Sequence, residues 1–382
     1  MAKWFEKRLD EIAEFNPRES LKKGSIAKKI SMDKLQPFCR DVPGFESEPY
    51  SGGTKFRNGD TIMARITPCL ENGKTAKVSV LENGEVGFGS TEYIVFRAKD
   101  GCDSDFLYYL VTSSIVRGSA IKSMVGSSGR QRVQTDVLQT LMVKVPDLET
   151  QQSISGILKS LDDKIAANRK INDNLEQQAR ALYQRMFIDN PVSGGYMGTL
   201  SDIADITMGQ SPNGSSYNED GNGAVFFQGR AEFGFRFPSV RLYTTEPKRM
   251  ACANDTLMSV RAPVGDLNVA YTDCCIGRGL AAIHSKSNQQ SFVLYTMFSL
   301  HKQLDVFNGE GTVFGSINRT SLTELPIFIP SDREIVKFEA IVAPIDAAIR
   351  NNYEEICRLE KIRDALLPKL MSGELDVSAV EL

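Results

Sequence analysis

Few residues of this 382-residue chain have the types and spacing that catalysis requires. Gly73-Lys74-Thr75 is similar to the end of a phosphate-binding GxxxxGK[ST] loop, but Pro68 stands where the first glycine is needed, which favours a hairpin turn. A nucleophilic serine or cysteine needs a histidine partner. The only histidines are His284 and His301, which we expect at the ends of a strand and of a helix. The sequence therefore predicts no catalytic site in this chain.

Metal binding and disulfide bonding have equally little support in the sequence. No carboxylate cluster follows the D-x-[DN]-x-[DN]-G pattern of a calcium loop. The cysteines form neither a CxxC pair nor an even set, which argues against a structural zinc site and favours a reducing cytoplasm. The seven cysteines stand at positions 39, 69, 102, 252, 274, 275 and 357.

Composition predicts a globular chain of two or three domains. Charged residues make up 24% and hydrophobic residues 41% of the sequence, which excludes wholesale disorder. The net charge of −3 argues against a protein that coats nucleic acid non-specifically, and leaves local basic surfaces open. No run of about 18 apolar residues exists, and residues 1–10 lack the apolar stretch of a secretory signal, so we expect no membrane segment.

The chain contains an internal repeat. Gly59-Asp60-Thr61-Ile62-Met63-Ala64 returns as Asn254-Asp255-Thr256-Leu257-Met258-Ser259, at an offset of 195 residues. Leu161-Asp162 matches Ile345-Asp346 at an offset of 184, and from there the offset holds without a gap. Offsets that drift first and then become constant predict two similar halves with divergent loops, each half ending in a segment of fixed length.

The segment of fixed length has the heptad spacing of a long helix in both halves. Seam positions recur in steps of four and three from Ile154 to Met186 and from Phe338 to Leu370. Each stripe covers about 33 residues, or roughly 48 Å of helix. One stripe alone would fit an ordinary amphipathic core helix, but two at a constant offset predict a pair. The predicted seam comprises Leu158, Leu161, Ile165, Asn172, Leu175, Leu182, Val342, Ile345, Ile349, Asn352, Ile356, Leu359 and Leu366.

The two helices are expected to run antiparallel, because the second half must begin near the end of the first helix. Full overlap gives facing residues whose numbers sum to 524, which places Met186 opposite Phe338 and Asn172 opposite Asn352. Two facing amides could hydrogen-bond and penalise slipped alignments. The alternative is a wet, frayed seam in which the asparagines meet no partner. Pro344 predicts either a kink in the second helix or its true start.

Mixed α/β segments, at about 1–147 and 195–330, are expected to precede the two helices. The fold class is therefore α+β: two mixed α/β domains in an internal repeat, separated by two long helices that form an antiparallel coiled coil. Expected strands are Thr61–Ile66, Gly89–Phe96, Leu141–Val145, Thr256–Val260 and Leu325–Ile329.

A series of motifs in the first half resembles the specificity subunit of type I restriction–modification systems. That family has a Gly-Ser-rich turn, an L-x-x-L-x-[VI]-x-[VI]-P strand, an E-x-Q element and an L-D-x-x-I helix after each target-recognition domain. The chain carries these in order as Val125-Gly126-Ser127-Ser128-Gly129, Leu138 to Pro146, Glu149-Thr150-Gln151-Gln152 and Leu161-Asp162-Asp163-Lys164-Ile165. The resemblance covers nearly the whole chain.

The second copy of the series is weaker. It reads Gly309-Glu310-Gly311-Thr312, Leu322 to Pro330 and Ile345-Asp346-Ala347-Ala348-Ile349, with Arg333-Glu334-Ile335 where the E-x-Q element is expected. Gly209-Gln210-Ser211-Pro212 is similar to the family's early recognition-domain loop. The resemblance implies target-recognition domains at 1–147 and 191–330 and spacer helices at 148–190 and 331–376.

The resemblance implies a non-catalytic subunit that reads a bipartite, asymmetric target in double-stranded DNA. It implies partners as well: two methyltransferase (modification) subunits docked on the coiled coil, and restriction/translocase subunits. S-adenosylmethionine, ATP and Mg are expected in those partners and no cofactor in this chain. A spacer of about 48 Å exceeds one DNA turn of roughly 34–36 Å, which fits two half-sites separated by unread base pairs.

DNA-contacting residues are predicted by type and place. Arginine, asparagine and glutamine can bond bidentately to guanine or adenine, whereas lysine and serine mostly hold phosphates. For any single candidate a solvated surface residue is the favoured interpretation, and the prediction applies to the set. The candidates are Arg65, Arg130, Gln131 and Arg132 in the first half, Gln210, Arg230, Arg261, Arg278, Ser316 and Asn318 in the second, and Lys22, Lys23, Lys28 and Lys29 for phosphates.

Two other functions remain open from the sequence. The chain could be a non-catalytic protein-interaction scaffold without DNA contact. The mild acidity of the chain slightly favours this alternative. The chain could also be a stand-alone DNA-binding regulator, although no helix-turn-helix spacing is evident. Salt-dependent binding to duplex DNA would separate the scaffold from the other two.

Overall fold

The computed structural model describes residues 3–127, 129–189, 194–309, 315–377 and 380. Ser128 and residues 310–312, which belong to the motifs above, lie outside these ranges. The chain divides into two compact units: unit 1 contains Met1–Lys170 and Tyr353–Leu382, and unit 2 contains Ile171–Asn352. The division falls within both long helices, so each unit contains part of each helix.

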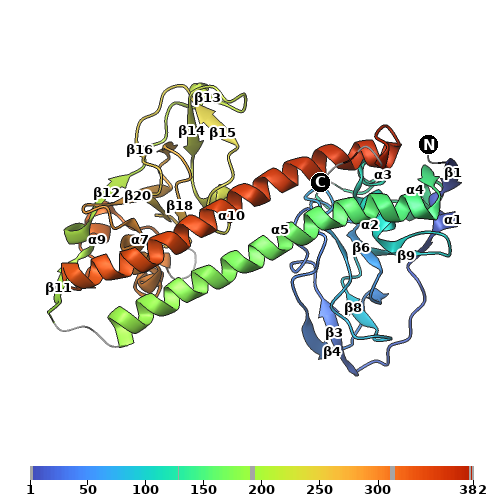
Figure 1. Ribbon diagram of the computed structural model, residues 1–382, viewed down its shortest axis with the longest axis horizontal. Coiled ribbons are helices and arrows are strands. Elements are labelled where there is room, and N and C mark those ends of the chain that lie inside the picture. The colour runs from blue at the N-terminus through green and yellow to red at the C-terminus, as the bar shows by residue number, and fades with distance from the viewer. Residues whose placement is uncertain (1–2, 128, 190–193, 310–314, 378–379, 381–382) are drawn as a thin grey trace. The chain divides into compact units, whose positions relative to one another are not determined.

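Unit 1 is built from two four-stranded sheets, a strand pair and short helices (Figure 1). The first sheet has the order β2 (Ala13–Phe15), β9 (Tyr93–Ala98), β6 (Thr61–Ala64), β7 (Thr75–Lys77). The second has the order β4 (Glu46–Pro49), β3 (Ile26–Ile30), β8 (Gly87–Gly89), β5 (Lys55–Phe56). The pair is β1 (Trp4–Arg8) with β10 (Met142–Pro146), and the helices are α1 (Leu9–Ile12), α2 (Ser104–Thr112), α3 (Ser114–Lys122) and α4 (Thr135–Gln139).

Unit 2 repeats this topology. Its first sheet has the order β12 (Ala204–Met208), β20 (Leu280–Ser285), β17 (Thr256–Ser259), β18 (Leu267–Val269). Its second has the order β13 (Tyr217–Asn218), β15 (Leu242–Thr244), β14 (Ala224–Phe227), β19 (Cys274–Ile276), β16 (Met250–Ala251). The pair is β11 (Tyr196–Thr199) with β21 (Pro326–Ile329), and the short helices are α6 (Leu200–Ile203), α7 (Gln290–Ser299), α8 (His301–Asp305), α9 (Arg319–Thr323), η2 (Gly214–Ser216), η3 (Arg230–Glu232) and η4 (Val306–Asn308).

The first sheets of the two units correspond strand by strand, and the second sheets differ by β13, which unit 2 adds at its edge. The strands β2, β9, β6 and β7 have the order of β12, β20, β17 and β18, and every pairing in both sheets is antiparallel. Each second sheet contains one parallel pair, β3 with β8 in unit 1 and β14 with β19 in unit 2. All residues of β6 and β17 are buried, which explains why their sequences stayed similar while the loops diverged.

Two long helices follow the sheets. Helix α5 (Leu148–Tyr183) continues into the π-helical segment η1 (Gln184–Asp189), and α10 spans Asp332–Ser372. Within each unit a half of α5 packs antiparallel against a half of α10 (Figure 1). None of the helices in the described part of the chain has an apolar stretch long enough to cross a membrane.

Two sequence expectations about these elements are wrong, and one of the two alternatives for Pro344 is excluded. Gly89–Phe96 is not one strand, because β8 ends at Gly89 in one sheet and β9 begins at Tyr93 in the other. Pro344 does not mark the start of α10, which begins at Asp332 because Ile335 and Phe338 are buried in unit 2 and hold the first turns. Phe338 packs on Tyr183 and Phe187 at ring distances of 5.6 and 5.4 Å, where Met186 was expected. A straight helix rotates by about 20° per heptad relative to an exact seven-residue repeat. Over more than four heptads this rotation moves the position that faces the partner helix by about one residue.

Candidate nucleic-acid interface

Several predicted DNA-contacting residues of unit 2 meet at one end of its first sheet. Gln210 follows β12, Arg278 precedes β20 and Arg261 follows β17. Because neighbouring strands are antiparallel, these three positions lie at the same end of the sheet. We call this end of the sheet the unit 2 edge.

Backbone hydrogen bonds tie the loops of the unit 2 edge together. The Gln210 N–H donates to the Ile276 carbonyl at 3.0 Å, and the Arg278 N–H donates to Ser211 Oγ at 3.3 Å. The Val260 N–H donates to the Gly279 carbonyl at 2.9 Å. Arg261 is bridged to Ser316, which adds a fourth candidate.

The polar side chains at the unit 2 edge are exposed. This holds for Gln210, Arg261, Arg278 and Ser316. No carboxylate lies within ion-pair distance of Arg261 or Arg278 among the residues that the structure describes. Two guanidinium groups and an amide that face solvent at one edge can donate to bases or phosphates without first breaking an internal bond.

Two further candidates of unit 2 are already engaged. Arg230 on η3 forms an ion pair with Asp266. The Asn318 side chain caps α9, where its Oδ1 accepts the Ser321 N–H at 2.8 Å. Asparagine at this position satisfies an otherwise free N–H of the helix, which is a structural reason for the residue type.

The corresponding end of the first sheet in unit 1 holds Arg65, Gln131 and Arg132. Arg65 follows β6, and its carbonyl accepts the Val133 N–H at 2.9 Å. Gln131 exchanges hydrogen bonds with Thr67, and Arg132 is bridged to Ile66, as Ser316 is to Arg261. We call this end the unit 1 edge.

A carboxylate that the sequence did not single out occupies the unit 1 edge. Glu92, just before β9, accepts from Arg65 Nε at 3.1 Å and from the Arg132 guanidinium at 2.7 Å. The hydrogen bond from Arg132 is the largest influence and, with Arg65, lowers the Glu92 pKa despite partial burial. Both arginines are therefore paired with Glu92 at the surface, and DNA would have to compete with this carboxylate for them.

The remaining candidates of unit 1 differ in whether their side chains are paired with a carboxylate. The Arg130 side chain is exposed beyond the glycine turn, and Lys22 and Lys23 are exposed in the turn before β3. Lys28 lies 2.9 Å from Glu85, and Lys29 lies 2.9 Å from Glu48. The two lysines of β3 are thus paired with carboxylates.

The helix seam contains the predicted asparagine pair. Asn352 Nδ2 donates to Asn172 Oδ1 at 2.8 Å, and Asn172 Nδ2 donates to the Ile349 carbonyl at 3.3 Å. The predicted antiparallel facing of Asn172 and Asn352 is confirmed, whereas the same register does not hold at Met186 and Phe338. Among the other seam residues, Leu158, Leu161, Ile165, Val342, Ile349 and Ile356 are buried, and Leu175, Leu182, Ile345, Leu359 and Leu366 are partly buried.

The aspartate of the repeated Leu-Asp motif anchors each set of sheets to the helices. In unit 1 the Tyr109 hydroxyl on α2 donates to Asp162 at 2.7 Å, and in unit 2 the Tyr295 hydroxyl on α7 donates to Asp346 at 2.9 Å. Both tyrosines are buried, and burial raises the pKa of each hydroxyl. The sequence showed the repeated aspartate but not its partner, because the tyrosines lie 53 and 51 residues away.

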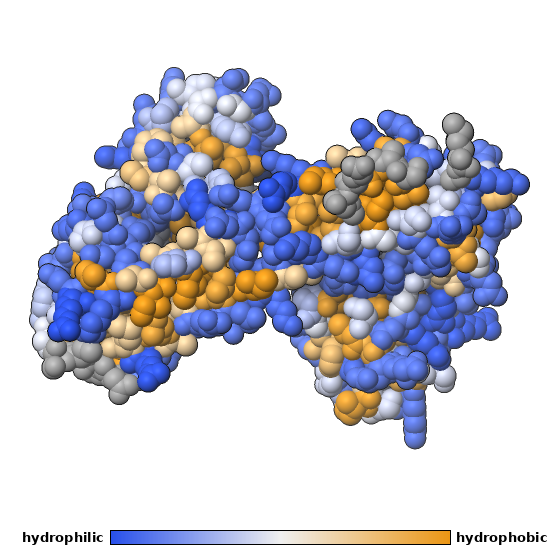
Figure 2. Space-filling model, viewed as in Figure 1, coloured by the Kyte–Doolittle hydropathy of each residue, from blue (hydrophilic) through white to orange (hydrophobic). Residues whose placement is uncertain are grey.

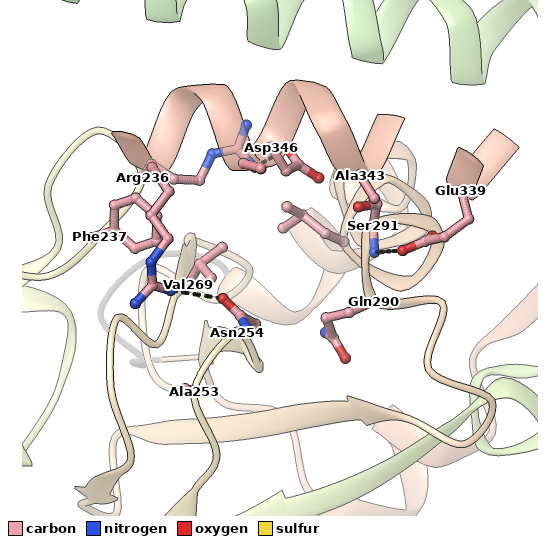
Figure 3. A pocket seen from close by; sticks show the side chains of 13 residues that line it. Arg236, Phe237, Ala253, Asn254, Val269, Gln290, Ser291, Glu339, Ala343 and Asp346 are labelled. Atoms are coloured by element: carbon pink, nitrogen blue, oxygen red, sulfur yellow. Dashed lines mark hydrogen bonds and ion pairs between the residues drawn. The ribbon is translucent and has the colours of Figure 1, made fainter. Parts of the chain in front are cut away.

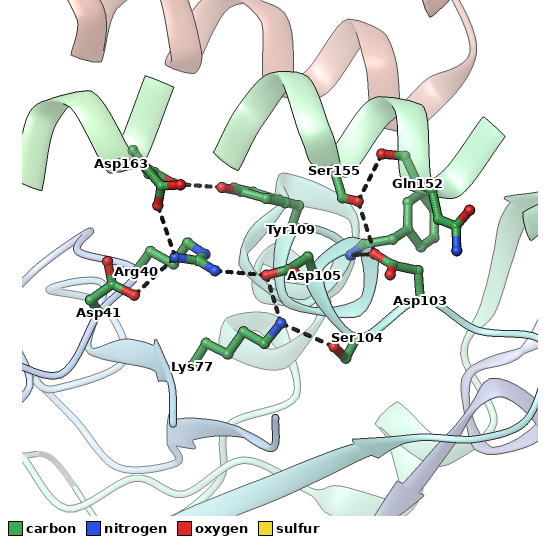
Figure 4. A network of polar contacts seen from close by, with 12 residues as sticks. Arg40, Asp41, Lys77, Asp103, Ser104, Asp105, Tyr109, Gln152, Ser155 and Asp163 are labelled. Carbon is green, nitrogen blue, oxygen red and sulfur yellow. Dashed lines mark hydrogen bonds and ion pairs between the residues drawn. The ribbon is translucent and has the colours of Figure 1, made fainter. Parts of the chain in front are cut away.

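A network of ion pairs supports the anchor in unit 1 (Figure 4). The Arg40 guanidinium, which is 9% exposed, bonds to Asp105 at 2.8 Å and to Asp163 on α5 at 3.4 Å. Lys77 approaches Asp105 to 2.6 Å. Ser155 on α5 donates to Asp103, the capping residue of α2, at 2.8 Å. These contacts bind the sheets of unit 1 to the first half of α5.

Unit 2 has a cavity of about 410 Å³ beside its anchor, between α7, α10 and the turn before β17 (Figure 3). Arg236 lies 3.1 Å from Asp346 and 3.0 Å from Glu176, and Glu339 accepts the Phe292 N–H at the start of α7 at 2.9 Å. Burial raises the pKa of Asp346 and of Glu339. Each of these charges has a partner within unit 2. The cavity therefore lies where the sheets of unit 2 pack on the helices, and its charged groups stabilise that packing.

Comparisons with known proteins agree with this architecture. Residues 1–177 match the family model described as the type I restriction modification DNA specificity domain. The putative type I restriction enzyme MjaX specificity subunit of Methanocaldococcus jannaschii is 32% identical over 257 residues, 63% of this chain and 60% of that protein. The type I restriction enzyme HindI specificity subunit of Haemophilus influenzae is 24% identical over 88% of this chain and 89% of that protein. The aligned part thus spans less than two thirds of the first relative.

These matches all name one family. Residues 1–177 match its DNA specificity domain, and the chain is similar to type I restriction enzyme specificity subunits. The fold agrees: the S subunit of a type I system from M. genitalium has a TM-score of 0.60 over 97% of this chain and 96% of that chain, at 16% identity. The family resemblance seen in the sequence and the α+β fold class of a specificity subunit are confirmed.

Proposed function

We propose that this specificity subunit reads a bipartite, asymmetric DNA target for a type I restriction–modification complex and performs no catalysis itself. The observation that carries the proposal is the repeated sheet edge with different side chains. Equivalent positions hold Arg132 in unit 1 and Ser316 in unit 2, and the carboxylate of Glu92 at the unit 1 edge has no counterpart near Arg261 or Arg278 among the described residues. Two copies of one scaffold with different donors read two different half-sites.

Each half of the proposed target is read by one α/β segment. Residues 1–147 and 191–330 serve as target-recognition domains, and residues 148–190 and 331–376 serve as spacer helices. The asparagine pair supports this assignment, because it fixes the helix register and so the number of unread base pairs that the helices impose.

The base-reading set of unit 2 comprises Gln210, Arg261, Arg278 and Ser316, with Arg230 held back by Asp266. In unit 1 Arg130 and Gln131 are free to read bases, while Arg65 and Arg132 act only after they leave Glu92. Lys22 and Lys23 contact phosphates. Lys28 and Lys29 contribute less, because binding DNA would cost them their carboxylate partners.

The helix pair docks the partner subunits. Apolar side chains that stay exposed on it include Val336 and Ile341 on α10, each about half exposed, and Ile171 on α5. Figure 2 shows an apolar band over the half of the helix pair in unit 2. The proposed partners are two methyltransferase subunits and the restriction subunits, which supply S-adenosylmethionine, ATP and Mg chemistry.

Salt-dependent binding to duplex DNA tests the proposal. The purified chain, alone or with its methyltransferase, is titrated with random-sequence duplex between 50 and 200 mM salt, the range over which phosphate contacts lose orders of magnitude in affinity. A specificity subunit shows a linear fall of log K with log salt. A protein-interaction scaffold binds no DNA at any salt concentration.

A further inference from the structure

Unit 2 contains a cluster of three metal-ligating side chains away from the proposed DNA edge. Cys252, Asp255 and His284 each bring one ligand atom, and these atoms all lie within 4.8 Å of one another. His284 Nδ1 lies 2.5 Å from Asp255 Oδ1. Asp255 is buried, whereas Cys252 and His284 reach solvent, so an ion can enter without opening the fold.

The repeat reveals what stands at the same three positions in unit 1. Asp60 precedes β6 as Asp255 precedes β17, and it accepts the Arg57 N–H at 2.8 Å just as Asp255 accepts the Cys252 N–H at 2.8 Å. The equivalences are Arg57 to Cys252, Asp60 to Asp255 and Arg97 to His284.

Strand register fixes the last of these equivalences. In unit 1, Arg97 of β9 pairs with Glu14 of β2, one residue beyond the Thr61 to Phe96 pair. In unit 2, His284 of β20 pairs with Asp205 of β12, one residue beyond the Thr256 to Ile283 pair.

Charge balance differs between the two copies. In unit 1 the buried Asp60 carboxylate receives two bonds of 2.7 Å from the Arg97 guanidinium, a permanent cation. In unit 2 the Asp255 side chain is 4% exposed and faces an imidazole and a thiol. A compensating positive charge stabilises a buried carboxylate, and the residues that stand in unit 2 at the positions of Arg57 and Arg97 are both metal ligands.

We propose that Cys252, Asp255 and His284 bind a divalent zinc ion that takes the place of the Arg97 cation. Sulfur, nitrogen and oxygen donors together suit zinc, which is four-coordinate with three protein ligands and one water. The site lies at the far end of β17 and β20 from Arg261 and Arg278, so the ion braces unit 2 and does not touch the DNA edge. It also braces the turn that Arg350 of α10 holds through Asn254, at 2.9 Å.

The spacing of these residues in the sequence does not predict the site. Cys252 and Asp255 stand close together, but His284 is 29 residues away from Asp255 and is brought in by the β17–β20 pairing. Zinc is usually predicted from sequence by four cysteine or histidine ligands in two close pairs. The proposed site lacks this pattern, because one of its ligands is an aspartate and another is water.

Metal titration of the reduced full-length chain tests the proposal. The metal-free protein is titrated with Zn²⁺ against a chromophoric chelator, and with Co²⁺ as a spectroscopic substitute. We expect one tight equivalent per chain, a thiolate-to-cobalt charge-transfer band and a higher thermal midpoint with zinc. Cys252→Ser and His284→Gln should weaken zinc binding at least about tenfold and, for Cys252→Ser, abolish the band.

Matched variants guard against a general loss of folding. Cys69→Ser and His301→Gln should bind zinc and cobalt as the wild type does. His284→Arg rebuilds the cation of unit 1, and should lose metal binding while the metal-free protein keeps at least the wild-type thermal midpoint. The proposal is overturned if the wild type takes up no tight equivalent, or if Cys252→Ser and His284→Gln bind zinc as the wild type does.

Discussion

The two sheet edges share a scaffold and differ in how their arginines are held. At the unit 1 edge Glu92 binds both Arg65 and Arg132, whereas at the unit 2 edge Arg261 and Arg278 have no carboxylate partner among the described residues. The strands behind both edges have the same order and register. The difference between the units therefore lies in loop side chains, which can change without repacking the core.

This difference bears on how each half-site would be bound. Arginines that are already free offer donors at once, whereas arginines held by a carboxylate must exchange one charged partner for another. The exchange costs affinity but rejects DNA that cannot replace both bonds of Glu92. Unit 2 is thus expected to supply more of the affinity, and unit 1 to depend more on a correct sequence.

The largest expected effect comes from the free arginines of unit 2. Arg261→Ala or Arg278→Ala should cost about 1–3 kcal/mol of specific binding if the residue reads a base, and relax the sequence preference at one position of one half-site. Competition binding with single-base variants of the target measures both effects. Arg333→Ala on α10 removes the same charge and should change neither, and uniform weakening on all sequences would reassign the arginine to a phosphate contact.

The anchors should behave alike in the two units, which sharpens the contrast with the edges. Tyr109→Phe removes the hydrogen bond to Asp162, and Tyr295→Phe removes those with Asp346 and Arg236. Each substitution should lower the free energy of unfolding by about 1 kcal/mol or more. Urea denaturation measures the change, and base preference should stay unchanged. A shift in base preference without a loss of stability would contradict the anchoring role.

Removing the carboxylate should make the unit 1 edge resemble the unit 2 edge. Glu92→Gln frees Arg65 and Arg132, so non-specific DNA binding should tighten and the slope of log K against log salt should steepen by about 1–2. Fluorescence anisotropy at several salt concentrations measures the slope. Glu149→Gln on α5 makes the same change of charge, and an equal steepening in that variant would show that net charge alone is responsible.

Lowering the pH should remove the difference in the free energy of unfolding between the wild type and Glu92→Gln. The Glu92 pKa is lowered in the folded state, so its ion pairs stabilise unit 1 above the ordinary glutamate value of about 4.3, and this contribution disappears as pH falls through the folded pKa. At pH 7 wild type should exceed Glu92→Gln by a few tenths of a kcal/mol, and the two should converge near pH 3. Urea midpoints at both pH values measure this, and a constant difference would contradict it.

The sequence predicted the repeat and the antiparallel helix pair, because these rest on periodic residues whose spacing is fixed by helix and strand geometry. The family was predicted from the resemblance of a motif series. Asn172 and Asn352 could be placed opposite each other from residue numbers alone. The boundary between β8 and β9 was missed because only the short polar segment Ser90-Thr91-Glu92 separates the two strands while the chain changes sheets.

The state of the candidate site was harder to predict, because it depends on contacts distant in sequence. Glu92 lies 27 residues from Arg65 and 40 from Arg132, and nothing in its local sequence marks it as their partner. The anchoring tyrosines and the Cys252–His284 cluster were missed for the same reason. Residue type gave the candidates, and only the fold shows which of them are free.

The central claim is that two similar units read two different half-sites. Its most direct test is co-expression of the chain with any methyltransferase encoded beside its gene. Methylated adenines are then mapped across the host DNA, for the wild type and for Arg261→Ala with Arg278→Ala. The wild type should methylate one split, asymmetric motif, and the double variant should relax only one half of it. A continuous or palindromic motif, or relaxation of both halves together, would contradict the claim.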